Sequence, residues 1–149
     1  MSKRSRDLEL FIVDVFVALY KIKEYTKTFE NAQDFSHSSL HWDASIRQLE
    51  IIGESLNYLL DDEKFTSHAP KYFRKIVNFR NVIIHGYFGI DVDEVWDVIE
   101  VKLTELDRDL LEIIKYIDIS HALKFEIKSY IDNDDKELVI YLKNIVDFR

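Results

Sequence analysis

Apolar residues recur at intervals of three and four along most of the chain, which is the spacing of one face of an α-helix. These runs predict long helices over residues 5–27, 40–62, 70–85 and 91–118. Pro70 falls in the first turn of the third helix, where proline is tolerated. Asp91 and Glu94 resemble a capping box and mark the start of the fourth helix.

The connections between these runs are short. A polar interval spans 30–39, and a charged connection spans 61–67. Gly86 and Gly89 bracket the end of the third helix, as a C-terminal cap followed by a tight loop would. The tail, residues 119–149, predicts two shorter helices, over about 122–131 and 137–148, split by a turn-prone run of Asp and Asn. The fold expected is an all-α, up-and-down helical bundle of four to five main helices, with the tail as a helical extension packed on a domain formed by residues 1–118.

Composition narrows the class of protein. The 149 residues, 47% of them apolar, suit one domain with a sizeable core. The absence of Cys excludes disulfides, a thiol nucleophile and Cys-based metal sites. Basic residues before an apolar run near the N-terminus resemble a signal peptide, but Asp7, Glu9 and Asp14 interrupt that run. We therefore expect a soluble, cytoplasmic protein that does not span a membrane.

Charge is distributed unevenly along the chain. The net charge is −8, which is a poor first indication of a nucleic-acid-binding protein. Residues 64–90, however, hold five basic and no acidic residues, so this segment is +5 and the rest of the chain −13. Lys71, Arg74 and Lys75 in this segment are candidates to guide an RNA backbone, although solvated helix charges would give the same pattern.

Three residues of the third helix suit phosphodiester chemistry. Asn81 and His85 lie one turn apart on one helix face, whereas Arg80 lies about 140° from His85. An imidazole ordinarily titrates near pH ~6.5 and so can move protons at neutral pH, and a guanidinium fork matches phosphate oxygens. RNA cleavage would then use the 2′-hydroxyl as nucleophile. The alternative is structural: Arg80 pairs with an acidic neighbour and His85 caps the helix C-terminus.

Two segments carry a resemblance to a known family. RNVIIHGYFGID at residues 80–91 and RQLEIIGE at residues 47–54 resemble motifs of the HEPN superfamily, and specifically of the HepT toxins of HEPN–MNT toxin–antitoxin pairs. The likeness covers about residues 6–116, in the expected order, and leaves the tail outside it.

The resemblance implies a metal-independent ribonuclease toxin of a type II/VII-like toxin–antitoxin pair, acting as a homodimer on RNA, with tRNA as one candidate and no cofactor. Arg80 and His85 match the catalytic positions, and Asn81 matches a supporting polar residue. Tyr87 matches the tyrosine that the partner MNT nucleotidyltransferase adenylylates. The alternatives are a non-catalytic helical subunit that binds substrate or nucleotide for a nucleotidyltransferase, and a purely structural oligomerisation bundle.

Other residues complete the expectations. Gly53 inside a helix predicts a close approach of another helix. Arg47, Glu50 and Glu54 have a spacing that allows ion pairs along the helix or with Arg80. His37 and His41 have the spacing of a pair of zinc ligands on a helix. No third ligand is evident, so no metal site is expected. The nearby Ser38, Ser39 and Asp43 are candidates to cap the helix that follows.

Overall fold

The computed structural model describes residues 2–86 and 89–148, and every regular element among them is helical. The elements are α1 (Lys3–Thr26), α2 (Ala32–His37), α3 (Ser39–Leu59), α4 (Glu63–Thr66), α5 (Phe73–His85), α6 (Val92–Asp97), the π-helix η1 (Val98–Lys102), α7 (Leu103–Ile113), α8 (Ser120–Asp132) and α9 (Lys136–Phe148). The prediction of an all-α bundle is confirmed.

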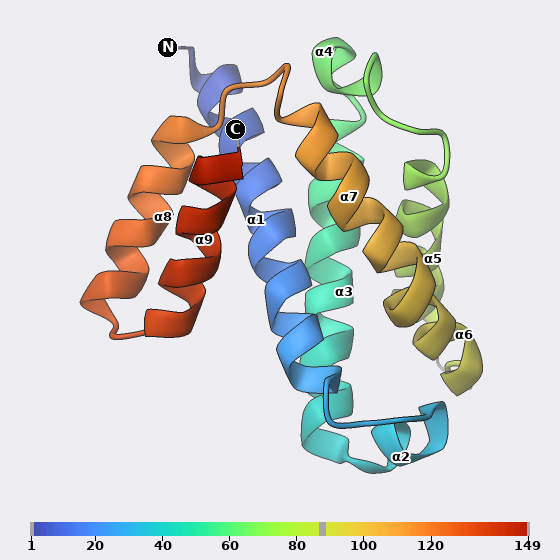
Figure 1. Cartoon of the computed structure of the whole chain (residues 1–149). Helices are drawn as coiled ribbons and strands as arrows, with labels where there is room; N and C mark the ends of the chain where they lie inside the picture. The colour runs from blue at the N-terminus through green and yellow to red at the C-terminus, as the bar shows by residue number, and fades with distance from the viewer. Residues whose placement is uncertain (1, 87–88, 149) are drawn as a thin grey trace.

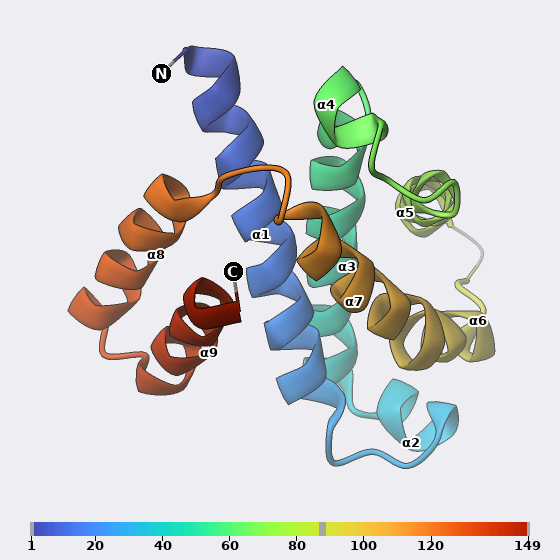
Figure 2. The same ribbon diagram turned by 45° about the horizontal axis from the view of Figure 1, so that its top comes forward.

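The long helices run up and down in two layers (Figures 1 and 2). α1 and α3 lie antiparallel in the middle of one layer, with α8 beside α1 and α5 beside α3. α7 and α9 lie across one side of this layer. Between the layers, the side chains of Phe16, Phe35, Phe65 and Phe73 are fully buried, each removing a large apolar surface from water.

Two short helices occupy segments that the sequence marks as polar connections. Asn31 caps α2, because its side chain accepts a hydrogen bond from the Asp34 N–H at 2.9 Å. Asp62 caps α4 in the same way, from the Phe65 N–H at 3.0 Å. Each helix is held to the core by a single buried phenylalanine, Phe35 or Phe65, which is too weak a signal for periodicity to detect.

Several helix boundaries differ from the prediction by a few residues, and α3, predicted to reach residue 62, ends at Leu59. α5 begins at Phe73, because Pro70 lies in a turn whose carbonyl accepts a hydrogen bond from the Phe73 N–H at 3.2 Å. The predicted helix over 91–118 is divided into α6, η1 and α7 and ends at Ile113. At η1 the helix widens by one residue, since the Leu103 N–H bonds to the Val98 carbonyl.

The tail forms a hairpin of two helices against α1. The Ala122 N–H donates to the Glu9 carboxylate at 3.4 Å, and the Tyr141 hydroxyl donates to the Phe16 carbonyl at 3.2 Å. The two tail helices that the sequence predicts are therefore present as α8 and α9. Among the described residues, no helix combines the length and hydropathy that crossing a bilayer requires.

Candidate active site

α5 approaches α3 most closely at Gly53, and Arg80 lies at this contact. A Cβ atom added to Gly53 would stand 2.2 Å from Arg80 Cβ and 2.5 Å from Arg80 Cγ. Real Cβ atoms do not approach this closely, so the missing side chain is what allows the Arg80 stem to lie across α3. The close helix approach predicted at Gly53 is confirmed.

The two terminal nitrogens of the Arg80 guanidinium are bound by one residue from each helix. Its Nη1 donates to Asn81 Oδ1 at 3.0 Å, and its Nη2 pairs with Glu54 Oε1 at 3.3 Å. The side chain stays 25% exposed. Asn81, which accepts one of these hydrogen bonds, lies one turn before His85 on the same face of α5.

His85 ends α5 and is exposed. Within the described part of the chain its imidazole makes no hydrogen bond, and both ring nitrogens are able to bond to a ligand. Gly86 caps the helix, and its N–H donates to the Ile83 carbonyl at 3.4 Å. His85 lies in the last turn of α5, so the structural role considered for it at the helix C-terminus is also compatible with its position.

The contacts of Arg80 leave two features of chemical interest. Its Nε is buried and has no hydrogen-bond partner among the described residues, which disfavours this conformation by the desolvation of one donor. Glu54 is about half exposed, so its ion pair with Arg80 is a weak one that a phosphate could replace. The pairing of Arg80 with an acidic neighbour, and the pairing of Arg47 with Glu50 at 3.3 Å along α3, are both observed.

The other basic candidates lie on or just before α5. Lys71, Arg74 and Lys75 are exposed, and Arg74 Nη1 donates to Asn57 Oδ1 at 3.3 Å. The sequence analysis missed Asn57, although it lies one turn after Glu54 on the same face of α3.

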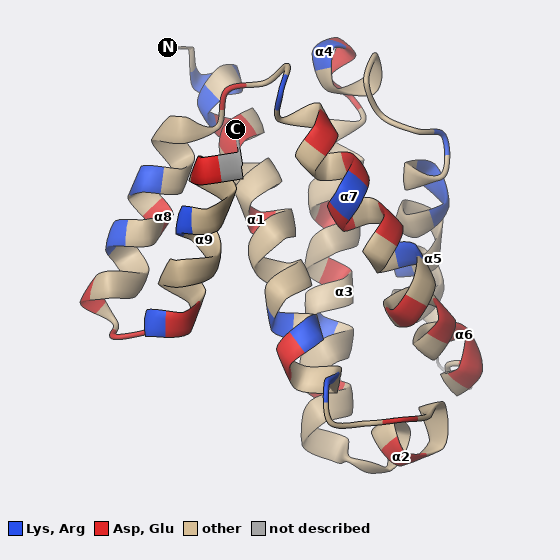
Figure 3. Ribbon diagram, in the orientation of Figure 1, with Lys and Arg blue, Asp and Glu red and all other residues tan. Residues whose placement is uncertain are grey.

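A strongly acidic region follows in the chain. Residues 91–113 carry nine acidic and two basic side chains, and acidic residues line α6 and α7 in Figure 3. The acidic side chains of α6 and α7 would repel the negatively charged phosphates of RNA. RNA would therefore be directed away from α6–α7 and toward α5.

The remaining candidates divide into two groups. Tyr87 lies outside the described residues. At the pair with zinc-ligand spacing, His41 Nδ1 hydrogen-bonds Ser38 Oγ at 2.7 Å. Ser38 is the N-cap residue of α3, as predicted, but its hydroxyl does not cap the helix because it bonds to His41. The described residues contain no group of three His, Asp or Glu side chains placed to hold a metal ion.

Comparison with known proteins places this site in a family. The model of the family described as "Ribonuclease HepT-like" matches residues 17–116, which include α3, α5 and the whole of the Arg80 site. The chain belongs to the HepT-like ribonuclease family. The resemblance to HepT is thereby confirmed, and the predicted enzyme class, a ribonuclease, is that of the family.

Individual relatives agree with this assignment. The chain is 32% identical over 112 residues to a "Putative RNase" of Methanocaldococcus jannaschii, covering 74% of this chain and 97% of the relative. It is 31% identical over 96 residues to a "Probable ribonuclease HepT" of Thermococcus cleftensis, covering 64% of this chain and 86% of the relative.

A longer protein of Methanocaldococcus jannaschii matches the tail as well. It carries the name "Gamma-glutamylcyclotransferase and putative RNase" and is 28% identical over 142 residues, or 95% of this chain. The chain spans 63% of the length of that relative. No solved structure gives a significant match to the HepT-like chain.

Proposed function

We propose that this HepT-like protein is a metal-independent endoribonuclease in which Arg80 and His85 are the catalytic residues and Asn81 supports them. The observation that carries the proposal is the course of the Arg80 side chain. Gly53 lets its stem lie against α3, and its guanidinium donates to Asn81, which lies one turn before the exposed His85 on α5.

Arg80 and His85 have complementary roles in the proposed reaction. His85 accepts the proton of the ribose 2′-hydroxyl, whose oxygen forms a bond to phosphorus while the bond to the 5′-oxygen of the next nucleotide breaks. The departing oxygen takes up a proton, and the products are a cyclic phosphate and a 5′-hydroxyl. Arg80 exchanges Glu54 for the phosphate and stabilises the charge that develops on its oxygens.

The proposed active form is a homodimer. One imidazole cannot be both the neutral base and the cationic acid of the same step, and each chain supplies only one His85. Two copies that place their α5 helices together would provide one neutral and one protonated imidazole, with two Arg80 guanidinium groups around one phosphate. The exposed Val82, 52% accessible on α5, supplies apolar surface for such a contact.

The proposal extends to a toxin role with a cognate MNT nucleotidyltransferase as antitoxin. Attachment of AMP to Tyr87 would place a phosphate and a nucleoside two residues from His85, where they would compete with RNA for Arg80. Mass spectrometry of the protein co-expressed with the nucleotidyltransferase tests this step. We expect adducts of one or more AMP units on Tyr87, and an adduct on another residue instead would contradict it.

Cleavage of labelled RNA in the presence of EDTA tests the nuclease proposal. We expect the wild-type protein to cut and His85→Ala and Arg80→Ala to lose at least ~100-fold in rate, the usual effect of removing a proton-transfer group. His121→Ala is the matched control, because His121 is exposed on α8, away from the site. Equal activity in wild type and His85→Ala would remove the assignment, as would no activity in the wild type.

The contacts of Arg80 with α3 also favour a second function. Its ion pair with Glu54 and the packing of its stem against Gly53 suit a residue that holds α3 and α5 together. In this alternative the chain is a non-catalytic helical subunit that presents substrate or nucleotide to a nucleotidyltransferase. RNA binding without cleavage, retained in His85→Ala, would support this alternative over the nuclease.

A further inference from the structure

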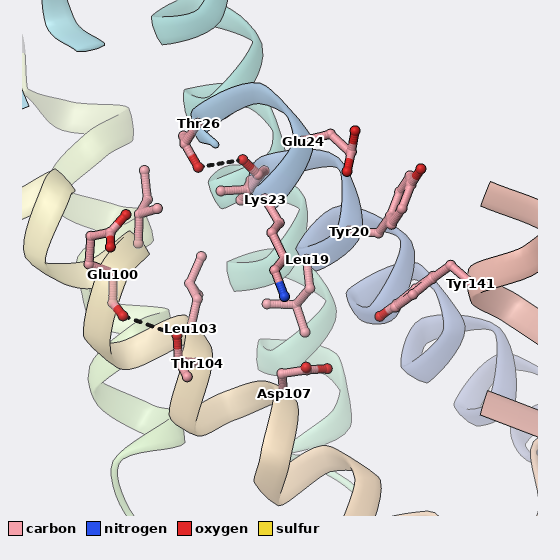
Figure 4. A pocket seen from close by; sticks show the side chains of 12 residues that line it. Leu19, Tyr20, Lys23, Glu24, Thr26, Glu100, Leu103, Thr104, Asp107 and Tyr141 are labelled. Atoms are coloured by element: carbon pink, nitrogen blue, oxygen red, sulfur yellow. Dashed lines mark hydrogen bonds between the residues drawn. The ribbon is translucent and has the colours of Figure 1, made fainter. Parts of the chain in front are cut away.

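A cavity of about 410 Å³ lies between α1, η1, α7 and α9, and no residue of α3 or α5 lines it (Figure 4). Its volume is within the range of small-molecule sites in proteins, ~300–1,000 Å³. The floor is apolar and consists of Leu19, Ile22, Ile99 and Leu103. The cavity is therefore separate from the Arg80 site and has the amphipathic lining of a ligand pocket.

Most polar groups at the cavity already have partners. Glu24 accepts a hydrogen bond from Lys27 at 2.7 Å. The Thr26 and Thr104 hydroxyls donate to the carbonyls of Ile22 and Glu100, at 2.8 and 3.0 Å. Because these groups are already hydrogen-bonded within the protein, they have little hydrogen-bonding capacity left for a ligand.

Lys23 and Asp107 are different. Lys23 comes from α1 and Asp107 from α7, and in Figure 4 the Lys23 ammonium points toward Asp107 across the cavity, whereas the Asp107 carboxylate is turned to one side and Glu24 and Glu100 point away. They nevertheless form no ion pair. Burial raises the pKa of the Asp107 carboxyl, and the facing ammonium of Lys23 opposes that shift only in part. Each charge is thus placed to gain from a ligand that carries the opposite one.

The remaining walls of the cavity come from the tail helix α9 and from the π-helix η1. Tyr141 of α9 packs beside Tyr20 of α1, with ring centroids 4.9 Å apart, and its hydroxyl is held by the Phe16 carbonyl. Tyr141 lies beyond the segment that the family model matches. The π-helix η1 contributes Ile99 and Glu100, and single π-turns are often found at functional sites.

We propose that this cavity binds a free α-amino acid with an apolar side chain. The carboxylate of the ligand accepts hydrogen bonds from Lys23, its ammonium donates to Asp107, and its side chain covers the floor formed by Leu19, Ile22, Ile99 and Leu103. An amine or an acid alone would satisfy only one of the two charges and leave the other without a partner. The zwitterion is the smallest ligand class that satisfies both.

Calorimetric titration of the full-length protein with L-leucine tests the proposal, with isopentylamine and isocaproate as matched probes that lack the carboxylate or the ammonium. We expect saturable binding of leucine and binding at least roughly tenfold weaker for each analogue, because each loses one charged contact. An absence of saturable binding by leucine overturns the proposal. Equal affinity for leucine and isopentylamine also overturns it, since the cavity would then be a site for cations only.

Variants assign the binding to these two residues. Lys23→Met and Asp107→Asn should each weaken leucine binding about tenfold, while Lys23→Met should not weaken the binding of isopentylamine. Glu24→Gln is the control, because Glu24 lines the same cavity but its carboxylate is bound to Lys27. An equal loss in Glu24→Gln would contradict the proposed geometry, and thermal melts without ligand show whether each variant is folded. The outcome is independent of the ribonuclease assay, since the cavity shares no lining residue with the Arg80 site.

Discussion

Gly53 lies directly beneath Arg80, so closely that any side chain at position 53 would collide with the Arg80 Cβ and Cγ atoms. The collision involves atoms next to the backbone, which cannot be relieved by a change of rotamer at the end of the side chain. Gly53→Ala should therefore force α5 away from α3, destabilise the fold by about 1–3 kcal/mol and lower RNA cleavage. Chemical denaturation and the cleavage assay measure the two effects.

Alanine in a helix interior is otherwise favoured over glycine by about 1 kcal/mol, so the sign of the change is informative. Asp43→Ala is a control on the same helix, since Asp43 is exposed. If Gly53→Ala stabilised the protein, as propensity alone predicts, the close contact with Arg80 would be wrong.

The link between Asn81 and Arg80 leads to a second prediction. Asn81→Ala removes the acceptor that binds Nη1 of Arg80, so we expect cleavage to fall about tenfold with little change in the melting temperature. Asn78→Ala is the matched control, because Asn78 is also exposed on α5, about one turn earlier, and makes no contact with Arg80. Similar losses in both variants would show that Asn81 has no special part in placing the guanidinium.

The sequence contained most of this arrangement. Periodicity placed the long helices, the isolated Gly53 indicated a close helix contact, and the spacing of Glu54 allowed its pairing with Arg80. What it could not provide was the path of the Arg80 side chain, because that path depends on how α5 crosses α3, a tertiary relationship that no local pattern encodes. The pairing of Arg74 with Asn57 escaped for the same reason.

The sequence also did not predict the extra residue at η1 or the placement of Lys23 and Asp107 at the same cavity. The apolar spacing of the 91–118 run continues through the π-turn, since Ile99 within it and Leu103 just after it are four positions apart, as in an ordinary α-helix. Lys23 and Asp107 are 84 positions apart and each lies in an ordinary amphipathic helix. They line the same cavity only because α1 and α7 pack side by side.

A third prediction concerns the start of α5, which is fixed to α7. The Tyr72 hydroxyl donates to the Asp109 carboxylate, and burial together with this carboxylate raises the pKa of Tyr72, so the phenol remains a donor. Tyr72→Phe should destabilise the protein by about 1 kcal/mol or more, measured by chemical denaturation. Tyr58→Phe should have a much smaller effect, because the Tyr58 ring only stacks on Phe11. Equal effects would mean that the Tyr72 bond is not formed in solution.

A fourth prediction is the pH dependence of the attachment of α8 to α1. Burial raises the pKa of the Asp14 carboxyl, and burial and the nearby Asp14 charge raise the pKa of Glu126. A carboxyl whose pKa is higher in the folded state binds protons more tightly there, so this part of the fold gains stability as the pH falls from neutral toward the ordinary carboxyl range. Asp14→Asn should raise the melting temperature at pH ~7 and reduce the gain seen on acidification.

Thermal melts of wild type and Asp14→Asn across this pH range decide the matter. Asp97→Asn, which removes an exposed carboxylate on α6, should leave the pH dependence as it is in the wild type. A wild-type protein that only loses stability on acidification, with Asp14→Asn following the same curve, would contradict the unfavourable burial of Asp14.

The last prediction addresses the path of RNA along α5. Binding of single-stranded nucleic acid weakens with salt by about 0.7 in the log–log slope for each phosphate neutralised. If Lys71 and Lys75 contact the RNA backbone, the double variant Lys71→Ala/Lys75→Ala, made in a His85→Ala background to prevent cleavage, should bind more weakly and lose about 1.4 from the slope. The control is Lys124→Ala/Lys128→Ala, which removes two exposed lysines from α8. Its net charge is therefore the same as that of the Lys71→Ala/Lys75→Ala variant. A long-range effect of net charge would lower the slope equally in both double variants, whereas direct contact on α5 requires that only the first pair changes it.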